Sequence, residues 1–362
     1  MAITTIVITG GPCAGKSTAM QCIQKAFAQM GYTVLFVPET ATELISGGVA
    51  PWTCGANAEY QSCQLQLQLE KERIFKAAAR TMPQGKILIV CDRGALDNKA
   101  YMSEEDFYRV LAELRLNEVE LRDNYDAVFH LVTAAKGAEE FYTLANNAAR
   151  TETVEQAAAL DDKLICAWTG HPHLRVIDNS QNFQLKMKKL VAEIAAFLGE
   201  PQPLEIERKF LIEYPDIEWL EAQPNCKRVE IIQTYLQSKE GEERRVRQRG
   251  DGAHFLYFLT EKRKISEFKR VETERKISKD EYLSLLLEAA TDKRQIRKTR
   301  YCLLYDNAYF EIDVYPFWKD KAIVEIELSD ENAEICLPKE FKLIKEVTDD
   351  ARYKNAALAN VK

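Results

Sequence analysis

The chain has 362 residues, of which 46% are hydrophobic and 29% charged, and its formal net charge at pH 7 is −7. This composition is typical of globular proteins, and the length favours two domains over one. The negative charge argues against general nucleic-acid binding, and no apolar run approaches the roughly 18 residues of a membrane-spanning helix.

The first apolar stretch is predicted to be a strand, because no basic region of the kind that opens a signal peptide precedes it. Nine cysteines are scattered along the chain without a C-x-x-C pair. This pattern is typical of reduced thiols and does not indicate a zinc site. We therefore expect a cytoplasmic protein with no membrane partner.

A strand at Thr5–Thr9 and a helix near Thr18–Met30 flank a glycine-rich loop that matches the P-loop pattern G-x-x-x-x-G-K-S/T. Small residues let backbone amides surround a polyphosphate at the N-terminus of the helix. Lys16 is expected to reach the β- and γ-phosphates, and the Ser17 hydroxyl to ligate Mg²⁺. The predicted nucleotide-binding residues are Gly10, Gly11, Pro12, Cys13, Ala14, Gly15, Lys16, Ser17 and Thr18.

Strands and helices alternate as far as residue 200, which predicts a parallel α/β sheet. The predicted strands are Thr33–Pro38, Ile87–Cys91, Ala127–Val132 and Leu174–Asp178. The predicted helices are Ala58–Thr81, Glu104–Arg122 and Phe183–Leu198. Pro201 and Pro203 break helix and strand alike, so Gly199–Pro203 is predicted to be a linker. We expect one domain over residues 1–200 and a second over residues 204–362.

Two acidic residues of the first half follow strands. Asp92 occupies a Walker B position, where it could hold Mg²⁺, or it could cap the next turn. Glu39 could act as a general base or as a favourable charge at a helix N-terminus. With Lys16 and Arg93 they form the predicted catalytic set. A segment at 150–152, which opens with Arg150, could form a lid or a solvated helix face.

The first half resembles the small AAA-type ATPase/kinase family of P-loop proteins. Asp92-Arg93-Gly94 is similar to the D/E-R-x element of nucleoside and nucleotide kinases. In proteins similar to deoxynucleoside kinases and nicotinamide riboside kinases, a carboxylate in the region of Glu39 faces the acceptor hydroxyl. The resemblance implies phosphoryl transfer from ATP or GTP to a small hydroxylated acceptor.

After residue 204, strands with period-two alternation dominate, which predicts an antiparallel domain and favours a barrel. The predicted strands are Glu205–Leu211, Ile231–Gln237, Arg244–Arg249, Phe255–Thr260, Phe268–Ile277, Arg297–Leu304, Tyr309–Tyr315 and Ile323–Leu328. One helix is predicted at Ser278–Ala290.

Like charges recur at i and i+2 along these strands, and such residues share one face. They repel one another unless a counter-ion lies between them, so acidic pairs indicate divalent cations and basic pairs indicate phosphate oxygens. The alternative is a sandwich with solvated outer faces. Crowded carboxylates should repel without metal, so removing one should not cost fold stability.

Glu205-Ile206-Glu207-Arg208-Lys209 resembles the E-x-E-x-K signature of the CYTH, or triphosphate tunnel metalloenzyme, superfamily. This resemblance covers residues 204–362 and implies an eight-stranded antiparallel tunnel that binds a triphosphate with Mg²⁺ or Mn²⁺. The implied metal ligands are Glu205, Glu207, Glu272, Glu274, Asp313, Glu325 and Glu327. The implied phosphate ligands are Lys209, Arg245, Arg247, Arg249, Lys262, Lys298 and Arg300, and Arg270 and Arg294 are further candidates.

Together these features predict a bifunctional, Mg²⁺-dependent phosphate enzyme, similar in its order of domains to plant tunnel proteins that carry a uridine-kinase-like domain. Two alternatives stay open. The second domain could be a class-IV-like adenylyl cyclase, or one domain could be a non-catalytic sensor in a nucleotide-regulated switch. The negative charge makes processing of RNA ends a weaker alternative.

Overall fold

The computed structural model describes residues 2–83, 85–142, 152–200, 206–239, 242–266, 269–306, 308–328 and 335–360, without the side chains at 2, 141, 206 and 263–273. The chain divides into two compact units, Met1–Glu205 and Ile206–Lys362. Within the described ranges, no helix has the length and apolar character needed to cross a bilayer.

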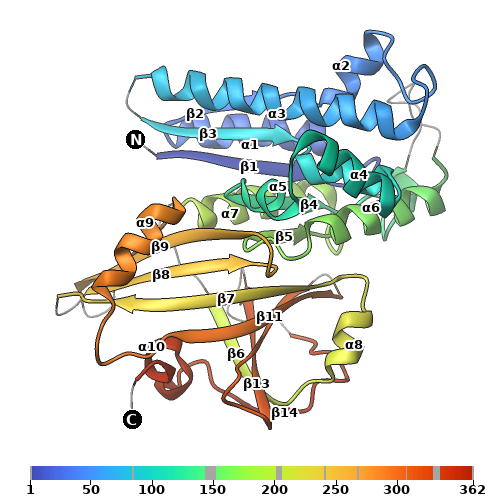
Figure 1. The fold of residues 1–362 in the computed structure, drawn as a ribbon. Coiled ribbons are helices and arrows are strands. Elements are labelled where there is room, and N and C mark those ends of the chain that lie inside the picture. The colour runs from blue at the N-terminus through green and yellow to red at the C-terminus, as the bar shows by residue number, and fades with distance from the viewer. Residues whose placement is uncertain are drawn as a thin grey trace. The chain divides into compact units, whose positions relative to one another are not determined.

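A five-stranded parallel sheet forms the centre of the N-terminal unit, in the order β2-β3-β1-β4-β5 (Figure 1). Its strands are β1 (Ala2–Thr9), β2 (Tyr32–Val37), β3 (Lys86–Asp92), β4 (Ala127–Leu131) and β5 (Leu174–Ile177). The register pairs Ile8 with Asp92 and Thr9 with His130. The segments that leave β1, β3 and β4 therefore start side by side at one edge, and the predicted parallel α/β architecture is confirmed.

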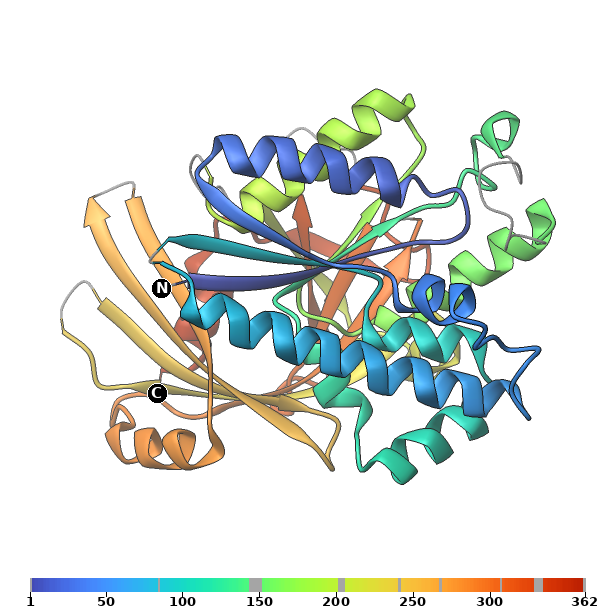
Figure 2. The same cartoon turned by 90° about the horizontal axis from the view of Figure 1, so that it is seen from above.

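Helices cover both faces of this sheet. They are α1 (Lys16–Gln29), α2 (Thr40–Ser46), α3 (Asn57–Thr81), α4 (Glu104–Leu114), α5 (Glu118–Asp123), α6 (Val154–Trp168) and α7 (Phe183–Phe197), with 3₁₀ turns η1 (Ala95–Tyr101) and η2 (Glu139–Phe141). Figure 2 shows α1 and α7 on one face and α3 on the other. Ile6 and Ile8 of β1 pack against Phe27 of α1 and Leu190 of α7 in a fully buried core.

The predicted helix Glu104–Arg122 is wrong, because two helices occupy this range. Arg115 has a φ of 56°, in the left-handed region that ends a helix. The Asn117 side chain then accepts a hydrogen bond from the Glu120 N–H at 2.8 Å and caps α5.

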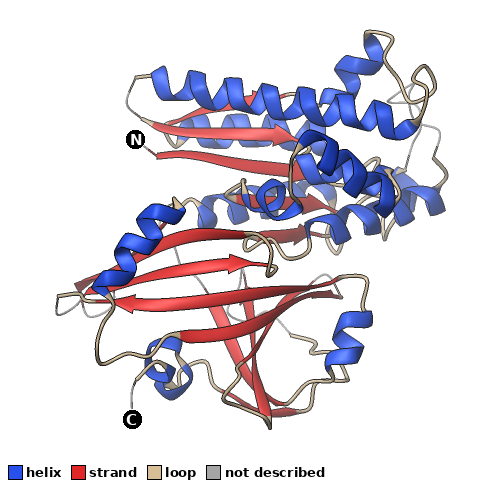
Figure 3. Cartoon of the chain, viewed as in Figure 1, coloured by secondary structure: helices blue, strands red, loops and turns tan. Residues whose placement is uncertain are grey.

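The C-terminal unit is built mainly of strands (Figure 3), which form a nine-stranded antiparallel sheet in the order β10-β9-β8-β7-β11-β12-β13-β6-β14. The strands are β6 (Ile206–Glu213), β7 (Cys226–Leu236), β8 (Glu242–Gly250), β9 (Phe255–Ser266), β10 (Lys269–Ile277), β11 (Ile296–Tyr305), β12 (Ala308–Val314), β13 (Lys321–Leu328) and β14 (Leu343–Glu346). The antiparallel β-rich architecture is confirmed.

The expected number of eight strands is corrected to nine by β14, a short edge strand that pairs with β6. In the strands that the structure describes, no pairing joins the outer strands β10 and β14. The small helical elements are α8 (Ile217–Ala222), α9 (Lys279–Leu285), α10 (Asn355–Leu358), η3 (Leu286–Glu288) and η4 (Ala351–Tyr353). The helix predicted at Ser278–Ala290 is therefore shorter, and a 3₁₀ turn continues it.

Cross-strand register places the charged residues of this sheet on one face. Lys209 lies opposite Glu325, Glu325 opposite Glu311, and Arg300 opposite Asp313. Side chains of directly opposed residues share a face. The other face is apolar and packs under α8 in a core that includes Phe210, Leu220, Phe310, Val324 and Ile326.

Candidate functional sites

The glycine-rich loop turns sharply from β1 into α1. Gly10 and Gly15 have φ values of 147° and 93°, which side chains rarely allow. A Cβ atom on Gly10 would lie 2.1 Å from the Leu131 carbonyl oxygen, and one on Gly15 would lie 2.6 Å from the Phe183 ring. The loop therefore requires glycine at both positions. Nucleotide binding by the nine loop residues stays a prediction.

Asp161 of α6 holds this loop in place, a role that the sequence analysis missed. The Gly11 N–H donates to Asp161 Oδ1 at 2.9 Å, and the Thr133 N–H donates to the same oxygen at 3.2 Å. His130 Nε2 lies 2.9 Å from Oδ1, and Lys136 Nζ lies 3.1 Å from Oδ2. Asp161 is fully buried. The available signal was its helical spacing from the apolar Ala157, Leu164 and Ile165, which places the carboxylate on the buried face of α6, where it needs a partner.

The four predicted catalytic residues lie in one charged cluster. Arg93 has a φ of 73°, an uncommon conformation for a non-glycine residue. Its Nε donates to Glu39 Oε1 at 2.5 Å, and its guanidinium lies 3.5 Å from Asp97 Oδ2. Asp97 was missed by the sequence analysis. It is buried and accepts hydrogen bonds from Thr9 Oγ1 at 2.8 Å and from the Trp168 indole at 2.6 Å.

Burial and neighbouring charges shift the pKa values of this cluster. Burial opposes ionisation of Glu39, but Arg93 and Lys16 outweigh it and lower the pKa of Glu39 to about 2. Burial lowers the pKa of Lys16, and the charge of Arg93 lowers it further. Burial raises the pKa of Asp92, with Lys16 acting in the opposite direction. With so low a pKa, Glu39 is a weak base, and near neutral pH it is an ionised hydrogen-bond acceptor.

The predicted Mg²⁺ ligands of the N-terminal unit fit a cation. Asp92 Oδ1 is buried and has no hydrogen-bond partner in the part of the chain that is described. Ser17 is exposed at the start of α1, next to Lys16. A buried, unsatisfied carboxylate oxygen together with an exposed hydroxyl suits a hard divalent ion.

On the charged face of the C-terminal sheet, basic and acidic side chains bind each other. Lys209 Nζ donates to Glu325 Oε1 at 2.6 Å, and Arg300 donates to Glu325 Oε2 at 2.8 Å. Arg300 also forms two bonds of 2.7 Å with Asp313, which in turn binds Lys298. Asp313 is fully buried, and Lys298, Arg300 and Glu325 are 6–8% exposed. These predicted ligands therefore form one buried network.

A second group lies on β8, β9 and β10. Arg247 donates to both carboxylate oxygens of Glu274 at 2.6 and 2.7 Å, and Thr260 Oγ1 donates to Glu274 at 2.7 Å. Arg249 is 2% exposed, and Arg245 lies opposite both Tyr235 and Thr260. This group comes from strands other than those of the Lys209–Arg300 network.

The remaining predicted ligands are less well defined. Lys262 lies opposite Glu272, whose side chain is outside the description, as is that of Arg270. Glu205 and Arg150 lie outside the described residues. Glu327 is exposed and lies opposite Glu207. The guanidinium of Arg294 lies 4.5 Å from the Phe317 ring centroid.

The carboxylates of this face have the chemistry of Mg²⁺ or Mn²⁺ ligands. Burial raises the pKa of Glu207, and the charge of Glu325 raises it further. A nearby cation would relieve this repulsion. Among the described residues, no three acidic, histidine or cysteine side chains are arranged as a metal site. The predicted metal ligands therefore stay a prediction.

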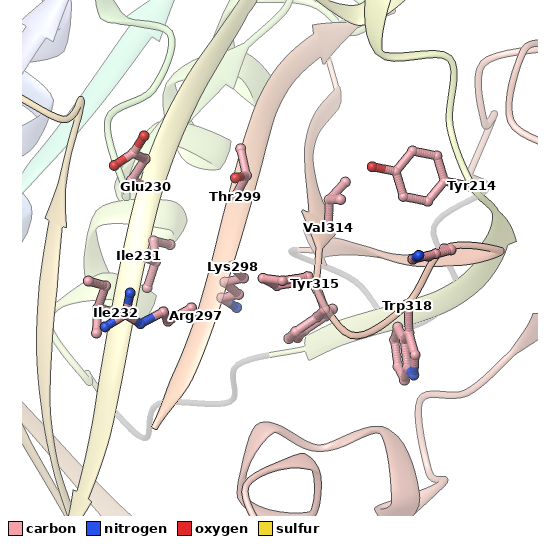
Figure 4. A pocket seen from close by; sticks show the side chains of 12 residues that line it. Tyr214, Glu230, Ile231, Ile232, Arg297, Lys298, Thr299, Val314, Tyr315 and Trp318 are labelled. Carbon is pink, nitrogen blue, oxygen red and sulfur yellow. The ribbon is translucent and has the colours of Figure 1, made fainter. Parts of the chain in front are cut away.

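A cavity of about 480 Å³ opens against β7, β11 and β12 (Figure 4). Glu230, Thr299 and Val314 line it together with Tyr214 and Trp318. Glu230, Thr299 and Val314 lie opposite one another on the face away from the charged network. Ile231, Lys298 and Tyr315 line the cavity too, and Lys298 belongs to the charged network through Asp313, so the cavity reaches the predicted phosphate-binding face at this residue.

Comparison with known protein families decides to which families the two parts of the chain belong. The profile of the AAA domain family matches residues 5–186, and that of the CYTH domain family matches residues 203–353. The chain belongs to both families. Both predicted memberships are thus confirmed, one for each part of the chain.

Relatives of the CYTH part are known. An inorganic triphosphatase of Nitrosomonas europaea is 39% identical over 160 residues, which are 43% of this chain and 96% of the relative. A solved structure of an inorganic triphosphatase is 34% identical and covers 44% of this chain and 96% of its own, with a TM-score of 0.31. A Pyrococcus horikoshii structure is 20% identical and covers 35% and 81%, with a TM-score of 0.27.

Proposed function

We propose that the C-terminal unit hydrolyses a triphosphate chain with the help of Mg²⁺ or Mn²⁺. The observation that carries the proposal is the buried network of Lys209, Lys298 and Arg300 with its carboxylates. Phosphate oxygens could replace the carboxylates at the three basic groups, because guanidinium and ammonium ions bind both kinds of anion. The relative's name, inorganic triphosphatase, supports the same chemistry.

In this reaction, a water oxygen forms a bond to the terminal phosphorus while the bond from that phosphorus to its bridging oxygen breaks. Orthophosphate and diphosphate result, and the released proton passes to bulk water. Glu207, Glu325 and Glu327 would hold the divalent cation, which when bound draws electron density from a phosphoryl oxygen. Arg300 and Lys298 would stabilise the negative charge that develops on the leaving diphosphate.

For the N-terminal unit, we propose binding of ATP or GTP and transfer of the γ-phosphoryl group to a small hydroxylated acceptor. The acceptor oxygen bonds to the γ-phosphorus, the bond to the β–γ bridging oxygen breaks, and the nucleoside diphosphate leaves. Lys16 would contact the phosphates, and Ser17 and Asp92 would hold Mg²⁺. Glu39 would accept a hydrogen bond from the acceptor hydroxyl and so orient it. The proton of that hydroxyl would pass to solvent.

A turnover screen with the full chain tests both activities. Inorganic triphosphate, thiamine triphosphate, ATP and GTP are offered separately with Mg²⁺ or Mn²⁺, and orthophosphate, nucleoside diphosphate and cyclic AMP are measured. We expect release of orthophosphate from a triphosphate, with a large loss in Arg300→Ala. Formation of cyclic AMP without orthophosphate would replace hydrolysis by cyclisation. Binding of triphosphate without any turnover would make the C-terminal unit a sensor.

A further inference from the structure

Glu72 of α3 is a buried carboxylate that the proposed reactions do not use. It is 2% exposed, and its Oε1 accepts hydrogen bonds from the Tyr125 hydroxyl at 2.8 Å and from the Gln68 amide at 3.2 Å. Its Oε2 is buried and has no hydrogen-bond partner among the described residues. A carboxyl group is costly to bury in place of an apolar side chain, so its presence inside the fold calls for an explanation.

Both partners of Glu72 also bind the backbone next to the P-loop. The Gln68 amide donates a second hydrogen bond to the Arg93 carbonyl at 2.9 Å, and the Ala95 N–H donates to the Tyr125 hydroxyl at 2.9 Å. One oxygen of Glu72 is therefore linked, through two side chains, to two backbone groups that are two residues apart. We call Gln68, Glu72 and Tyr125 the Glu72 bridge.

The donors and acceptors of the Glu72 bridge are fully assigned. Burial raises the pKa of Tyr125, and the charge of Glu72 raises it further, so the hydroxyl keeps the proton that it donates. The two amide hydrogens of Gln68 are divided between Glu72 and the Arg93 carbonyl. Burial also raises the pKa of Glu72, but Oε1 can accept both bonds in either protonation state. The acceptor oxygen, and not the charge, therefore holds the bridge together.

The backbone that the Glu72 bridge holds has an unfavourable conformation. The φ of Arg93 is 73°, which costs free energy in a residue with a side chain and persists where the surroundings impose it. The Arg93 N–H donates to the Ile8 carbonyl at 3.0 Å, and a Cβ atom on Gly94 would lie 2.5 Å from the Trp168 ring. These contacts fix the turn on both sides of the Arg93 carbonyl, and the bridge fixes the carbonyl itself.

The direction of the Arg93 side chain depends on this backbone. Its Nε donates to Glu39 Oε1 at 2.5 Å, and its guanidinium lies 3.5 Å from Asp97 Oδ2. Its Nη1 donates to the Gly10 carbonyl of the P-loop at 3.4 Å. Because the Cα–Cβ bond turns with φ, a return of Arg93 to an ordinary φ would carry the guanidinium away from these acceptors.

We propose that Glu72 is a positioning residue of the N-terminal site. Through Gln68 and Tyr125 it holds Arg93 in the conformation in which the guanidinium pairs with Glu39 and reaches the P-loop. The consequence for phosphoryl transfer rests on the proposed function of this unit, whereas the consequence for the pairing of Arg93 with Glu39 does not.

A double-mutant cycle tests the position of Arg93 without any substrate. Glu39→Gln is made in the parent and in Glu72→Met, which roughly keeps the volume of the side chain but removes the acceptor oxygen. Amide hydrogen exchange of the ligand-free full chain is measured at pH 7 in peptides from β1 and β3. We expect Glu39→Gln to lower protection by about tenfold in the parent and by less than about threefold in Glu72→Met. An equal loss in both overturns the proposal, because a residue that only stabilises the fold gives additive effects.

Further variants separate the acceptor oxygen from general damage to the core. Glu72→Gln keeps a carbonyl oxygen that can accept both bonds, so Glu39→Gln should again cost about tenfold in it; a loss as small as in Glu72→Met overturns the role of that oxygen. Glu70→Gln is the matched control at an exposed site of the same helix and should also leave the tenfold effect intact. If Glu72→Met does not fold, Gln68→Met, which removes the bond to the Arg93 carbonyl, replaces it in the cycle with the same two outcomes.

Turnover of ATP tests the consequence for the reaction, with water in place of the hydroxylated acceptor. Formation of nucleoside diphosphate is measured in the full chain, and the rate of the matching Lys16→Ala variant is subtracted. Glu72→Met should lower kcat by about tenfold or more, while the Kd of a non-hydrolysable ATP analogue changes by less than about threefold. An unchanged kcat overturns the consequence for transfer. If the parent shows no Lys16-dependent turnover, the proposed phosphoryl transfer fails, and the cycle with Glu39 still decides the role of Glu72.

Discussion

Replacing Glu325 with glutamine should destabilise the ligand-free C-terminal sheet. The carboxylate accepts one bond from Lys209 at 2.6 Å and one from Arg300 at 2.8 Å, in a side chain that is 8% exposed. Charge-assisted bonds contribute about 1.5–3 kcal/mol each, and the amide oxygen of glutamine can keep one neutral bond of about 1 kcal/mol. The expected loss is about 3 kcal/mol, in the range for breaking a buried ion pair.

Amide hydrogen exchange in EDTA, followed by mass spectrometry of the full chain, measures this loss in each unit separately. Protection in peptides from β6 and β13 should fall by about 100-fold, which corresponds to about 3 kcal/mol. Peptides from β1 and β3 should not change. Glu340→Gln is the matched control at an exposed site and should cost less than about 0.5 kcal/mol.

Lowering the pH should remove the difference in amide protection between Glu325→Gln and the parent. Burial opposes ionisation of Glu325, but Arg300, Lys298 and Lys209 together hold its pKa below the ordinary value of 4.5. A depressed pKa contributes stability above 4.5 and loses it as the pH falls. If the amides of Glu325→Gln are protected at pH 7 as well as those of the parent, or better, the ion-pair argument is refuted. That result would support repulsion between carboxylates, which the sequence led us to expect.

Three further predictions concern the N-terminal unit. Lys16→Ala should abolish nucleotide turnover and leave triphosphate hydrolysis unchanged, and equal loss of both in phosphate-release assays would contradict two separate sites. Asp161→Asn should weaken binding of an ATP analogue by about tenfold, because the Gly11 N–H loses an anionic acceptor; unchanged calorimetric affinity would show that the loop does not depend on Asp161. Glu39→Gln should lower stability to urea at pH 7, because Glu39 pairs with Arg93, and this difference should disappear as the pH falls from 4.5 towards about 2. A difference that persists at pH 2 would exclude that ion pair as its cause.

Local patterns determined the architecture of each half. The P-loop could be read directly, because its turn and helix start are made by consecutive residues and Gly10 and Gly15 have steric requirements of their own. Period-two spacing likewise placed Lys298 and Arg300 on one strand face, because side-chain direction in a strand depends only on position parity. Both family memberships followed from these short motifs.

Tertiary structure decided which groups meet. Asp161 reaches Gly11 across 150 positions of sequence, and Glu325 reaches Lys209 across 116. The sequence led to an expectation of repulsion among like charges, because carboxylates at positions i and i+2 of one strand point to the same face. Register between strands instead sets Glu325 beside Lys209 and Asp313 beside Arg300, and burial makes these pairings strong. Chain folding alone fixes such distances, so the ion-pair network and the support of the P-loop came from the structure.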